Sequence, residues 1–143
     1  MPRCANPAEA VRCVKTGHRV FLHGGVATPL LLVKALVDRA PELDDVEITH
    51  LHTSGGAEYA KPEYARSFRV ANLFTGGNMR PYMDHDRVDY VPCFLSEIPS
   101  LFRTQTRHLN VAMVQLSPPD KHGFCTLGTS VDVARAAVDC ADM

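Results

Sequence analysis

The segment LNVAMVQL, Leu109–Leu116, runs directly into SPPDKHGFCTLG, Ser117–Gly128, and this junction decides how the chain folds. The first part is strongly apolar and is typical of a buried strand. Pro118 and Pro119 cannot continue that strand, because proline lacks an N–H and has a fixed φ. The chain must therefore leave the sheet at Ser117. Loops at the carboxyl ends of strands bind ligands in open α/β sheets, so we expect a ligand near this loop.

The loop itself carries side chains that are common in binding sites. Asp120 offers a carboxylate, His122 offers an imidazole, and Gly123 allows a turn that other residues resist. The alternative is a rigid polar surface turn in which Asp120 accepts hydrogen bonds from its own backbone. The residues of the loop alone leave both interpretations open.

Four further apolar segments have the length of strands, and three of them are followed by a pair of glycines. The segments are Arg19–His23, Val46–Leu51, Phe68–Phe74 and Val88–Val91, and the glycine pairs are Gly24-Gly25, Gly55-Gly56 and Gly76-Gly77. About five strands thus alternate with helices, which predicts an α/β fold with a mostly parallel sheet and helices on both faces. The carboxyl ends of parallel strands share one edge of a sheet. We therefore expect four loops to lie together, namely those after His23, His52, Phe74 and Leu116.

Capping residues and prolines predict where the helices begin and end. The first helix should begin at Asn6, which can cap it, with Pro7 in the first position, and should end near Gly17. The second should open at Thr28 and stop at Pro41. Shorter helices are predicted from Asn78 to near His85, from Ser96-Glu97 onward, and over Val131–Val138 with Val131, Ala134 and Val138 on one side.

The turn at Gly24-Gly25 lies between a predicted strand and a predicted helix. This arrangement has the shape of a site that cradles a phosphate or a carboxylate, because the N–H groups of the helix start point at the ligand. The alternative is that the glycines only make a tight turn, since the chain has neither a full Gly-x-Gly-x-x-Gly pattern nor a P-loop. Both interpretations remain open at this point.

Composition excludes several classes of function. The 143 residues fit one domain, 1–143, and their apolar content of 45% is ordinary for a globular protein. A net charge of −1 without a basic cluster provides no field that would draw nucleic acid or an anionic membrane. No apolar run is long enough to span a bilayer, and the amino terminus lacks a signal-peptide core. We therefore expect a cytoplasmic protein with no nucleic-acid or membrane partner.

Cysteines and histidines give no clear metal site. The five cysteines are odd in number and form no Cys-x-x-Cys pair, so we expect reduced, metal-free thiols at Cys4, Cys13, Cys93, Cys125 and Cys140. His50 and His52 share a face of a predicted strand, but no third ligand accompanies them. A structural role is therefore the favoured interpretation of both histidines.

Several segments resemble one known family. SPPDKHGFCTLGTSVD, Ser117–Asp132, resembles the acetyl-CoA hydrolase/transferase family, especially its 4-hydroxybutyrate CoA-transferase branch. HGGVATP at His23–Pro29, FTGGNMR at Phe74–Arg80 and DYVPCFLSEIP at Asp89–Pro99 resemble the amino-terminal segments of that family, in the same order. Together these segments span most of the chain, from His23 to Asp132. The resemblance implies the CoA-transferase fold, which some sugar-phosphate isomerases share.

The resemblance also implies a mechanism that uses a glutamate nucleophile. In the family, a glutamate attacks the acyl-CoA thioester, and CoA thiolate then converts the resulting anhydride into a glutamyl-CoA thioester that a carboxylate or water resolves. That glutamate lies in the second domain of the family, and none of the six glutamates here matches its motif. We therefore expect an amino-terminal domain that lacks its catalytic partner, is inactive alone and forms homo-oligomers. Coenzyme A is implied as a substrate rather than a permanently bound cofactor.

Nine residues are expected beside the substrate, an acyl-CoA with a short carboxylate such as acetate as acceptor. Gly24, Gly25, Thr28 and Pro29 should form one wall, Asn78 and Arg80 another, and Asp120, His122 and Gly123 should close the mouth. Three alternatives stay open. They are an acyl-CoA hydrolase of the same family, a sugar-phosphate isomerase-like domain that binds phosphate at the glycine turn, and a non-catalytic interaction domain.

Overall fold

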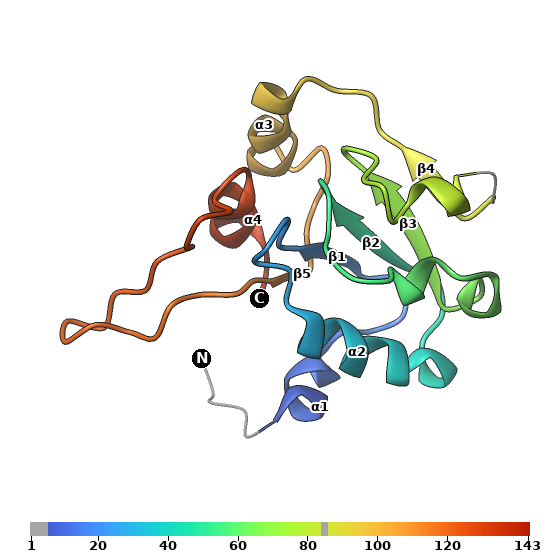
Figure 1. Ribbon diagram of the computed structural model, residues 1–143, viewed down its shortest axis with the longest axis horizontal. Coiled ribbons are helices and arrows are strands. Elements are labelled where there is room, and N and C mark those ends of the chain that lie inside the picture. The colour runs from blue at the N-terminus through green and yellow to red at the C-terminus, as the bar shows by residue number, and fades with distance from the viewer. Residues whose placement is uncertain (1–5, 84–85) are drawn as a thin grey trace.

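The sheet is entirely parallel. A computed structural model describes residues 6–83 and 86–143, and its five strands form one sheet in the order β4-β3-β2-β1-β5 (Figure 1). The strands are β1 (Arg19–Leu22), β2 (Val46–His50), β3 (Phe68–Asn72), β4 (Val88–Tyr90) and β5 (Val111–Met113). The predicted α/β fold with a parallel sheet is confirmed, and all strand exits, including those that precede Gly24 and Asp120, leave from the same edge.

Strand β1, which lies between β2 and β5, is the point at which the order of the strands changes direction. Its residue Val20 pairs with Ile48 of β2 on one side and with Val111 of β5 on the other. The chain builds outward from β1 to β4 and then crosses back to place β5 on the far side of β1. The loops that follow β1 and β5 therefore diverge at a topological switch point, where α/β sheets bind their ligands.

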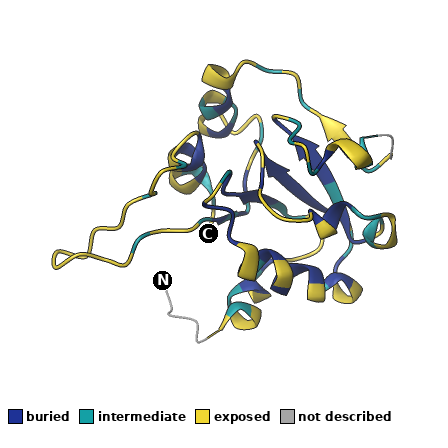
Figure 2. Ribbon diagram, in the orientation of Figure 1, coloured by how far each residue is buried: buried dark blue, intermediate teal, exposed yellow. Residues whose placement is uncertain are grey.

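Helices cover both faces of the sheet, as the sequence predicts. Helices α1 (Pro7–Ala10) and α2 (Leu30–Asp38) pack on one face, and α3 (Ile98–Arg103) and α4 (Ala134–Cys140) pack on the other. Figure 2 shows that β1, β2 and β3 are mostly buried, whereas β4 and the outer surfaces of the helices are exposed. Within the described residues, no helix combines the length and the apolar character that crossing a membrane requires.

Helix starts largely follow the predicted caps. The Asn6 side chain accepts a hydrogen bond of 2.9 Å from the Glu9 N–H, with Pro7 at the first helical position. The second helix begins at Leu30, and the Thr28 hydroxyl accepts from the Ser54 N–H of a neighbouring loop instead of capping its own helix. Between β3 and β4, Arg80–Tyr82 forms a short 3₁₀ turn, and the predicted helix end near His85 lies outside the described residues.

The last helix differs from its prediction. It begins at Ala134 rather than Val131, because Asp132 has a positive φ of 28° and accepts a hydrogen bond of 3.2 Å from the Ala134 N–H. This start turns a different face toward the sheet, so that Val131 and Val138 are exposed whereas Ala134 is buried. The buried face consists of Val133, Ala134, Ala136 and Ala137. The predicted side with Val131 and Val138 against the core is therefore wrong.

After α4 the backbone returns to the free edge of β5. The Met143 N–H donates to the Asn110 carbonyl at 3.1 Å, and the Met143 carbonyl accepts from the Ala112 N–H at 2.8 Å. Met143 thus bonds to Asn110 and to Ala112, the residues on either side of Val111. In a parallel ladder one residue bonds in this way to the two neighbours of the residue opposite it. The sheet thus continues past β5 by one parallel step.

A buried carboxylate ties the strands together at the opposite, amino-terminal edge. The Glu47 side chain is 3% exposed and contacts Arg19 of β1, Arg69 of β3 and Arg107 of the segment before β5. Arg69 Nη1 lies 2.7 Å from Glu47 Oε2. A carboxylate this deeply buried is tolerated only when it is paired, so the three guanidinium groups make burial of Glu47 possible.

Removing this carboxylate should destabilise the fold strongly. We expect Glu47→Gln to lower the free energy of unfolding by about 3 kcal/mol, because three arginines then lose their common counter-charge. The control is Glu42→Gln, which removes an exposed i,i+3 pair with Arg39 and should cost less than about 1 kcal/mol. Urea denaturation followed by circular dichroism measures both variants. Equal losses for the two would contradict this account of Glu47.

Candidate functional site

Three glycine turns meet at the carboxyl edge of the sheet, and His52 lies between two of them. The Gly25 N–H donates to the His52 carbonyl at 2.9 Å, which extends the β1–β2 pairing beyond both strands. A Cβ on Gly76 would lie 3.3 Å from His52 Cβ, so the third turn packs against the same residue. Gly25 also has a φ of +56°, which favours glycine at this position. The close approach of these turns requires residues without side chains.

Hydrogen bonds join the first glycine turn to the second. The Thr28 hydroxyl donates to the Gly25 carbonyl at 2.7 Å and accepts from the Ser54 N–H at 2.9 Å. The Ser54 hydroxyl donates to the same Gly25 carbonyl at 2.9 Å. The loops after β1 and β2 therefore form one rigid unit that includes the predicted residues Gly25 and Thr28, with Gly24 and Pro29 on either side.

Asn78 connects the third turn to this unit. Its Nδ2 donates to Thr53 Oγ1 at 3.2 Å and to the Gly55 carbonyl at 3.2 Å. A carbonyl can only accept, so the Gly55 contact assigns the orientation of the amide. With both N–H groups engaged, Asn78 Oδ1 remains a buried acceptor that has no partner among the described residues.

A chain of hydrogen bonds continues from Asn78 into the core. Thr53 Oγ1 lies 3.1 Å from the Tyr59 hydroxyl, which lies 3.1 Å from His50 Nε2. The other ring nitrogen of His50 faces the Leu51 carbonyl at 3.2 Å and must donate to it. In a neutral ring Nε2 then accepts from Tyr59, Tyr59 from Thr53, and Thr53 from Asn78. Every donor in this chain points toward the core. The chain therefore fixes the orientation of the Asn78 amide group from its core side.

Burial keeps the two titratable members of this chain, His50 and Tyr59, uncharged. His50 is fully buried, and burial lowers the pKa of its imidazole from 6.5 to about 4. Burial likewise raises the pKa of the Tyr59 hydroxyl well above its ordinary value. At neutral pH both groups therefore act as hydrogen-bonding partners with fixed roles and not as ions.

His23 pins both ends of the long loop that follows β5. This loop, the arm (residues 116–129), projects away from the body of the molecule (Figure 1). His23 is fully buried, its Nδ1 accepts from the Gln115 N–H at 3.3 Å, and its Nε2 contacts the Ser130 carbonyl. Because a carbonyl only accepts, Nε2 carries the proton. One neutral imidazole thus holds the residue before the arm and the residue after it.

The structure places Asp120, His122 and Gly123 at the far tip of the arm, where all three are exposed. The Asp120 carboxylate accepts from the N–H groups of His122 at 2.8 Å and of Phe124 at 2.9 Å. This is the alternative that composition suggested, a turn that Asp120 caps for itself. Arg80 is exposed as well, at the start of its 3₁₀ turn. Of the nine predicted residues, five therefore come together at the glycine turns and four do not.

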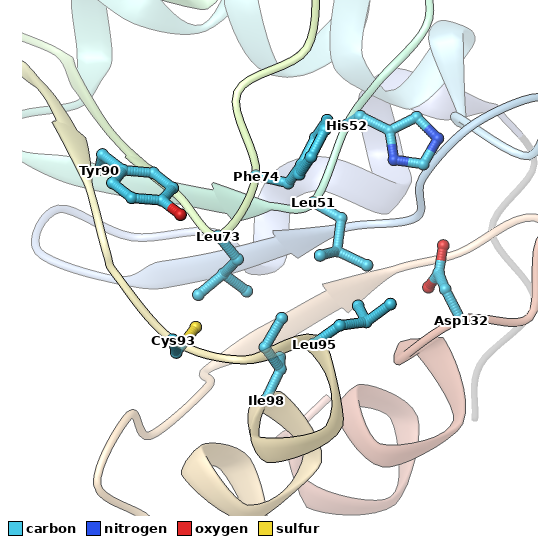
Figure 3. A pocket seen from close by; sticks show the side chains of 9 residues that line it. All are labelled: Leu51, His52, Leu73, Phe74, Tyr90, Cys93, Leu95, Ile98 and Asp132. Carbon is cyan, nitrogen blue, oxygen red and sulfur yellow. The ribbon is translucent and has the colours of Figure 1, made fainter.

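A cavity of about 550 Å³ opens beside the glycine turns, between the strand exits and α3 (Figure 3). Most of its wall is apolar, and the polar exceptions are His52 and the Asp132 carboxylate. The apolar wall consists of Leu51, Leu73, Phe74, Tyr90, Cys93, Leu95 and Ile98. Leu51 and Leu73 follow β2 and β3 directly, so the ends of these strands shape the floor of the cavity. A cavity of this size and character is typical of a small-molecule site.

His52 and Asp132 link the cavity to the first glycine turn. A Cβ on Gly24 would lie 3.0 Å from Asp132 Oδ2 and 3.0 Å from the His52 carbonyl. Figure 3 shows both polar side chains at one end of the cavity, with Tyr90 at the other. A ligand whose polar end lies at the Gly24 turn can therefore extend its apolar end into the cavity.

The histidines and cysteines do not form a metal site in the described part of the chain. His50 hydrogen bonds to Tyr59 on the α2 face, whereas His52 lines the cavity on the α3 face. The expectation that they share a face is wrong, because β2 ends at His50 and strand alternation does not extend to His52. No group of three or more metal-ligating side chains comes together within residues 6–83 and 86–143. Cys13, Cys93, Cys125 and Cys140 are free thiols, and Cys4 lies outside the described residues.

Sequence reasoning missed two residues of this site. The sequence analysis favours a structural role for His52 over a metal ligand, although its place at a strand exit between two glycine pairs is a usable signal of a site residue. Asp132 was counted only as the end of a family segment. Nothing in the sequence near Asp132 indicates that it lies against Gly24, because that contact depends on how the arm returns to the sheet.

Comparison with known proteins identifies the chain over nearly its whole length. A family model described as acetyl-CoA hydrolase/transferase N-terminal domain matches residues 2–143. The succinyl-CoA:acetate/propanoyl-CoA:succinate CoA transferase of Fasciola hepatica is 47% identical over 139 residues, which cover 96% of this chain and 29% of the relative. The 4-hydroxybutyrate coenzyme A transferase of Clostridium kluyveri is 38% identical over 135 residues, covering 94% and 32%. The chain thus spans about a third of these relatives.

Solved structures share the fold. RipA from Yersinia pestis superposes with a TM-score of 0.88 at 24% identity, over 96% of this chain and 34% of that structure. A 4-hydroxybutyrate CoA-transferase from Porphyromonas gingivalis superposes with a TM-score of 0.73 at 29% identity, over 96% and 30%. Both matches confirm the arrangement of strands and helices described above.

The pKa of His50 predicts how stability depends on pH. The unfolded imidazole binds a proton near pH 6.5 and the folded one only near pH 4, so the stabilisation is complete above pH 6.5 and is lost as pH falls toward 4. Between pH 7 and pH 4, wild type should lose about 3 kcal/mol more unfolding free energy than His50→Gln. Urea denaturation at several pH values measures this difference, with His122→Gln as the control. An identical pH dependence for His50→Gln and wild type would contradict the neutral, buried His50.

Proposed function

Because the chain belongs to the acetyl-CoA hydrolase/transferase family, as its N-terminal domain, we propose that it is the substrate-cleft domain of a CoA transferase. The enzyme would move CoA between a short acyl-CoA, such as 4-hydroxybutyryl-CoA or acetyl-CoA, and a carboxylate such as acetate. The observation that carries this proposal is the meeting of the family's glycine turns around His52, next to an apolar cavity. The names of the relatives support the reaction class, since both matched enzymes transfer coenzyme A.

Free backbone amides support a role in catalysis at the third glycine turn. None of the hydrogen bonds between described residues uses the N–H of Gly76 or of Gly77. Attack of a carboxylate on a thioester creates an oxyanion, and positioned backbone N–H groups stabilise such charge. Asn78, which the chain through Thr53, Tyr59 and His50 holds in place, lies next to these amides. The turn is therefore suited to hold the thioester carbonyl.

The nucleophile would come from outside this chain. In the proposed mechanism a glutamate carboxylate forms a glutamyl-CoA thioester, and this domain supplies binding and oxyanion stabilisation only. Its most deeply buried carboxylate, that of Glu47, lies at the opposite edge of the sheet among three arginines. A second domain or subunit would carry the glutamate, and a homo-oligomer is part of this proposal. Whether the glutamyl thioester passes to a carboxylate or to water would decide between transferase and hydrolase.

A chimera tests the proposed role directly. In the Clostridium kluyveri relative, the matched third of the enzyme is replaced by this chain, which is 38% identical to it. We expect the chimera to transfer CoA from 4-hydroxybutyryl-CoA to acetate and to form a glutamyl-CoA adduct visible by mass spectrometry. The 143-residue chain alone should show neither CoA transfer nor the adduct. A folded chimera without transfer, or an adduct on one of this chain's own glutamates, would overturn the proposal.

A pair of glycine variants tests the turn itself. Gly25→Ala places a Cβ 2.8 Å from Ser130 Oγ at a φ of +56°, so either the Ser130 side chain or the turn must move, and transfer by the chimera should fall at least about tenfold. Gly17→Ala is the matched control, because Gly17 has a φ of +75° but nothing within 4 Å of the added atom. Both variants bear similar backbone strain, and only the first disturbs the site. If both lost activity equally, strain rather than the turn would be responsible.

A further inference from the structure

Thr53 joins two of the glycine turns to the core of the protein. Its backbone forms an isolated parallel bridge with Gly25 of the first turn. Its hydroxyl oxygen lies 3.2 Å from Asn78 Nδ2, next to the third turn, and 3.1 Å from the Tyr59 hydroxyl. Thr53 is 9% exposed and Tyr59 is 3% exposed, so solvent hardly competes for these hydrogen bonds. The direction in which the Thr53 hydroxyl donates therefore affects the third turn.

Tyr59 determines that direction. A threonine hydroxyl has a single proton, so it can donate only one hydrogen bond while it accepts others. If Thr53 donated to Asn78, the amide would have to present its oxygen and would lose its 3.2 Å bond to the Gly55 carbonyl. Tyr59 prevents this, because its oxygen takes the Thr53 proton while its own proton goes to His50 Nε2 at 3.1 Å. Tyr59 thereby keeps Thr53 Oγ1 as an acceptor for the Asn78 amide.

Tyr59 itself lies too deep in the protein to touch a ligand in the cavity. It belongs to the core cluster on the α2 face of the sheet, whereas the cavity opens beside α3. Its ring meets the His50 ring at 66° with 5.9 Å between the ring centroids, an edge-to-face contact that helps to fix the direction of the hydroxyl. Any effect of the Tyr59 hydroxyl on a reaction in the cavity must therefore pass through Thr53.

Two hydrogen bonds from the Asn78 amide, to Thr53 and to the Gly55 carbonyl, tether the third glycine turn to the loop after β2. We propose that Tyr59 is a positioning residue for CoA transfer, because it keeps this tether in its working direction. The inference rests on the proposed function, in which the N–H groups of Gly76-Gly77 hold the thioester carbonyl. Donors stabilise an oxyanion best when they are held in place before the reaction, so a loosened turn slows the chemical step more than it weakens substrate binding.

The side-chain amide of Asn78 reports on the tether without any reaction. NMR of the 143-residue chain resolves its two N–H signals, which Asn78→Ala identifies by their loss. Tyr59→Phe should shift these signals and speed their exchange with solvent at least about fivefold, because Thr53 loses the partner that makes it an acceptor. Tyr64→Phe is the matched control, since the Tyr64 ring packs on Phe68 in the same connection between β2 and β3. The control should leave both signals unchanged.

Kinetics of the chimera with the Clostridium kluyveri relative test the role in transfer. We expect Tyr59→Phe to lower kcat about tenfold while the KM for 4-hydroxybutyryl-CoA stays within about twofold of the unmodified chimera. Tyr64→Phe should leave both constants unchanged. An unchanged kcat in Tyr59→Phe, or a rise in KM alone, would overturn the inference and leave the proposed function standing.

Variants of Thr53 trace the path from Tyr59 to the turn, and they keep the test decisive if Tyr59→Phe does not fold. Thr53→Val removes the hydroxyl and should lower kcat as Tyr59→Phe does, whereas Thr53→Ser keeps the hydroxyl and should retain kcat. The Tyr59→Phe/Thr53→Val double variant should lose no more than either single variant, because both act on one hydrogen bond. Additive losses, or equal losses in Thr53→Ser and Thr53→Val, would overturn the inference.

The two kinds of measurement separate this inference from the proposed function. An unmodified chimera that folds but transfers no CoA would overturn the proposed function. Active transfer together with unchanged Asn78 signals in Tyr59→Phe would overturn the role of Tyr59 alone.

Discussion

Parallel pairing of β1 with strands on both of its sides is the constraint on which the site depends. A parallel sheet sends every strand exit to one edge, and β1, with β2 on one side and β5 on the other, places the point of divergence beside its own exit. The glycine turn at Gly24-Gly25 follows that strand, and the loops after β2 and β3 stand in sequence next to it. The three turns therefore meet without any long excursion of the chain. The arm reaches the same place from the other side, because β5 is the second neighbour of β1.

The two edges of the sheet satisfy their buried polar groups in different ways. At the amino-terminal edge, charge is matched by charge, with Glu47 held by three arginines. At the carboxyl edge, a buried histidine, a tyrosine, a threonine and an amide form a neutral chain that ends in the Asn78 oxygen, which has no partner in the described part of the chain. Charged clusters hold their geometry by strong, non-directional attraction, whereas a neutral chain depends on direction. In the proposed function, this directional arrangement stands where the thioester must be oriented.

Sequence reasoning could predict the sheet and the first wall of the site. Alternating apolar segments and glycine pairs are local signals, so the strands, their parallel order and the turn at Gly25 followed from them. Thr28 lies at that turn, but its partner Ser54 is 26 residues away and could not be named from the sequence. The position of Asp120 was not predictable, because the direction of the arm depends on His23, Gln115 and Ser130 and on no local pattern. The face of α4 was wrong for a similar reason, since Asp132 delays the start of the helix.

The attachment of the arm has a mechanical consequence. Both ends of a long hairpin meet at one imidazole ring, so the arm is a lever whose fulcrum is His23. A force on the tip of the arm acts on both of its ends, because the residues at the two ends are bonded to the same ring. The torque passes to the end of β1 and to Gly24, the next residue along the chain. The Phe124 ring at the tip of the arm is 74% exposed. A partner that bound this ring would therefore also act on the geometry of the first glycine turn.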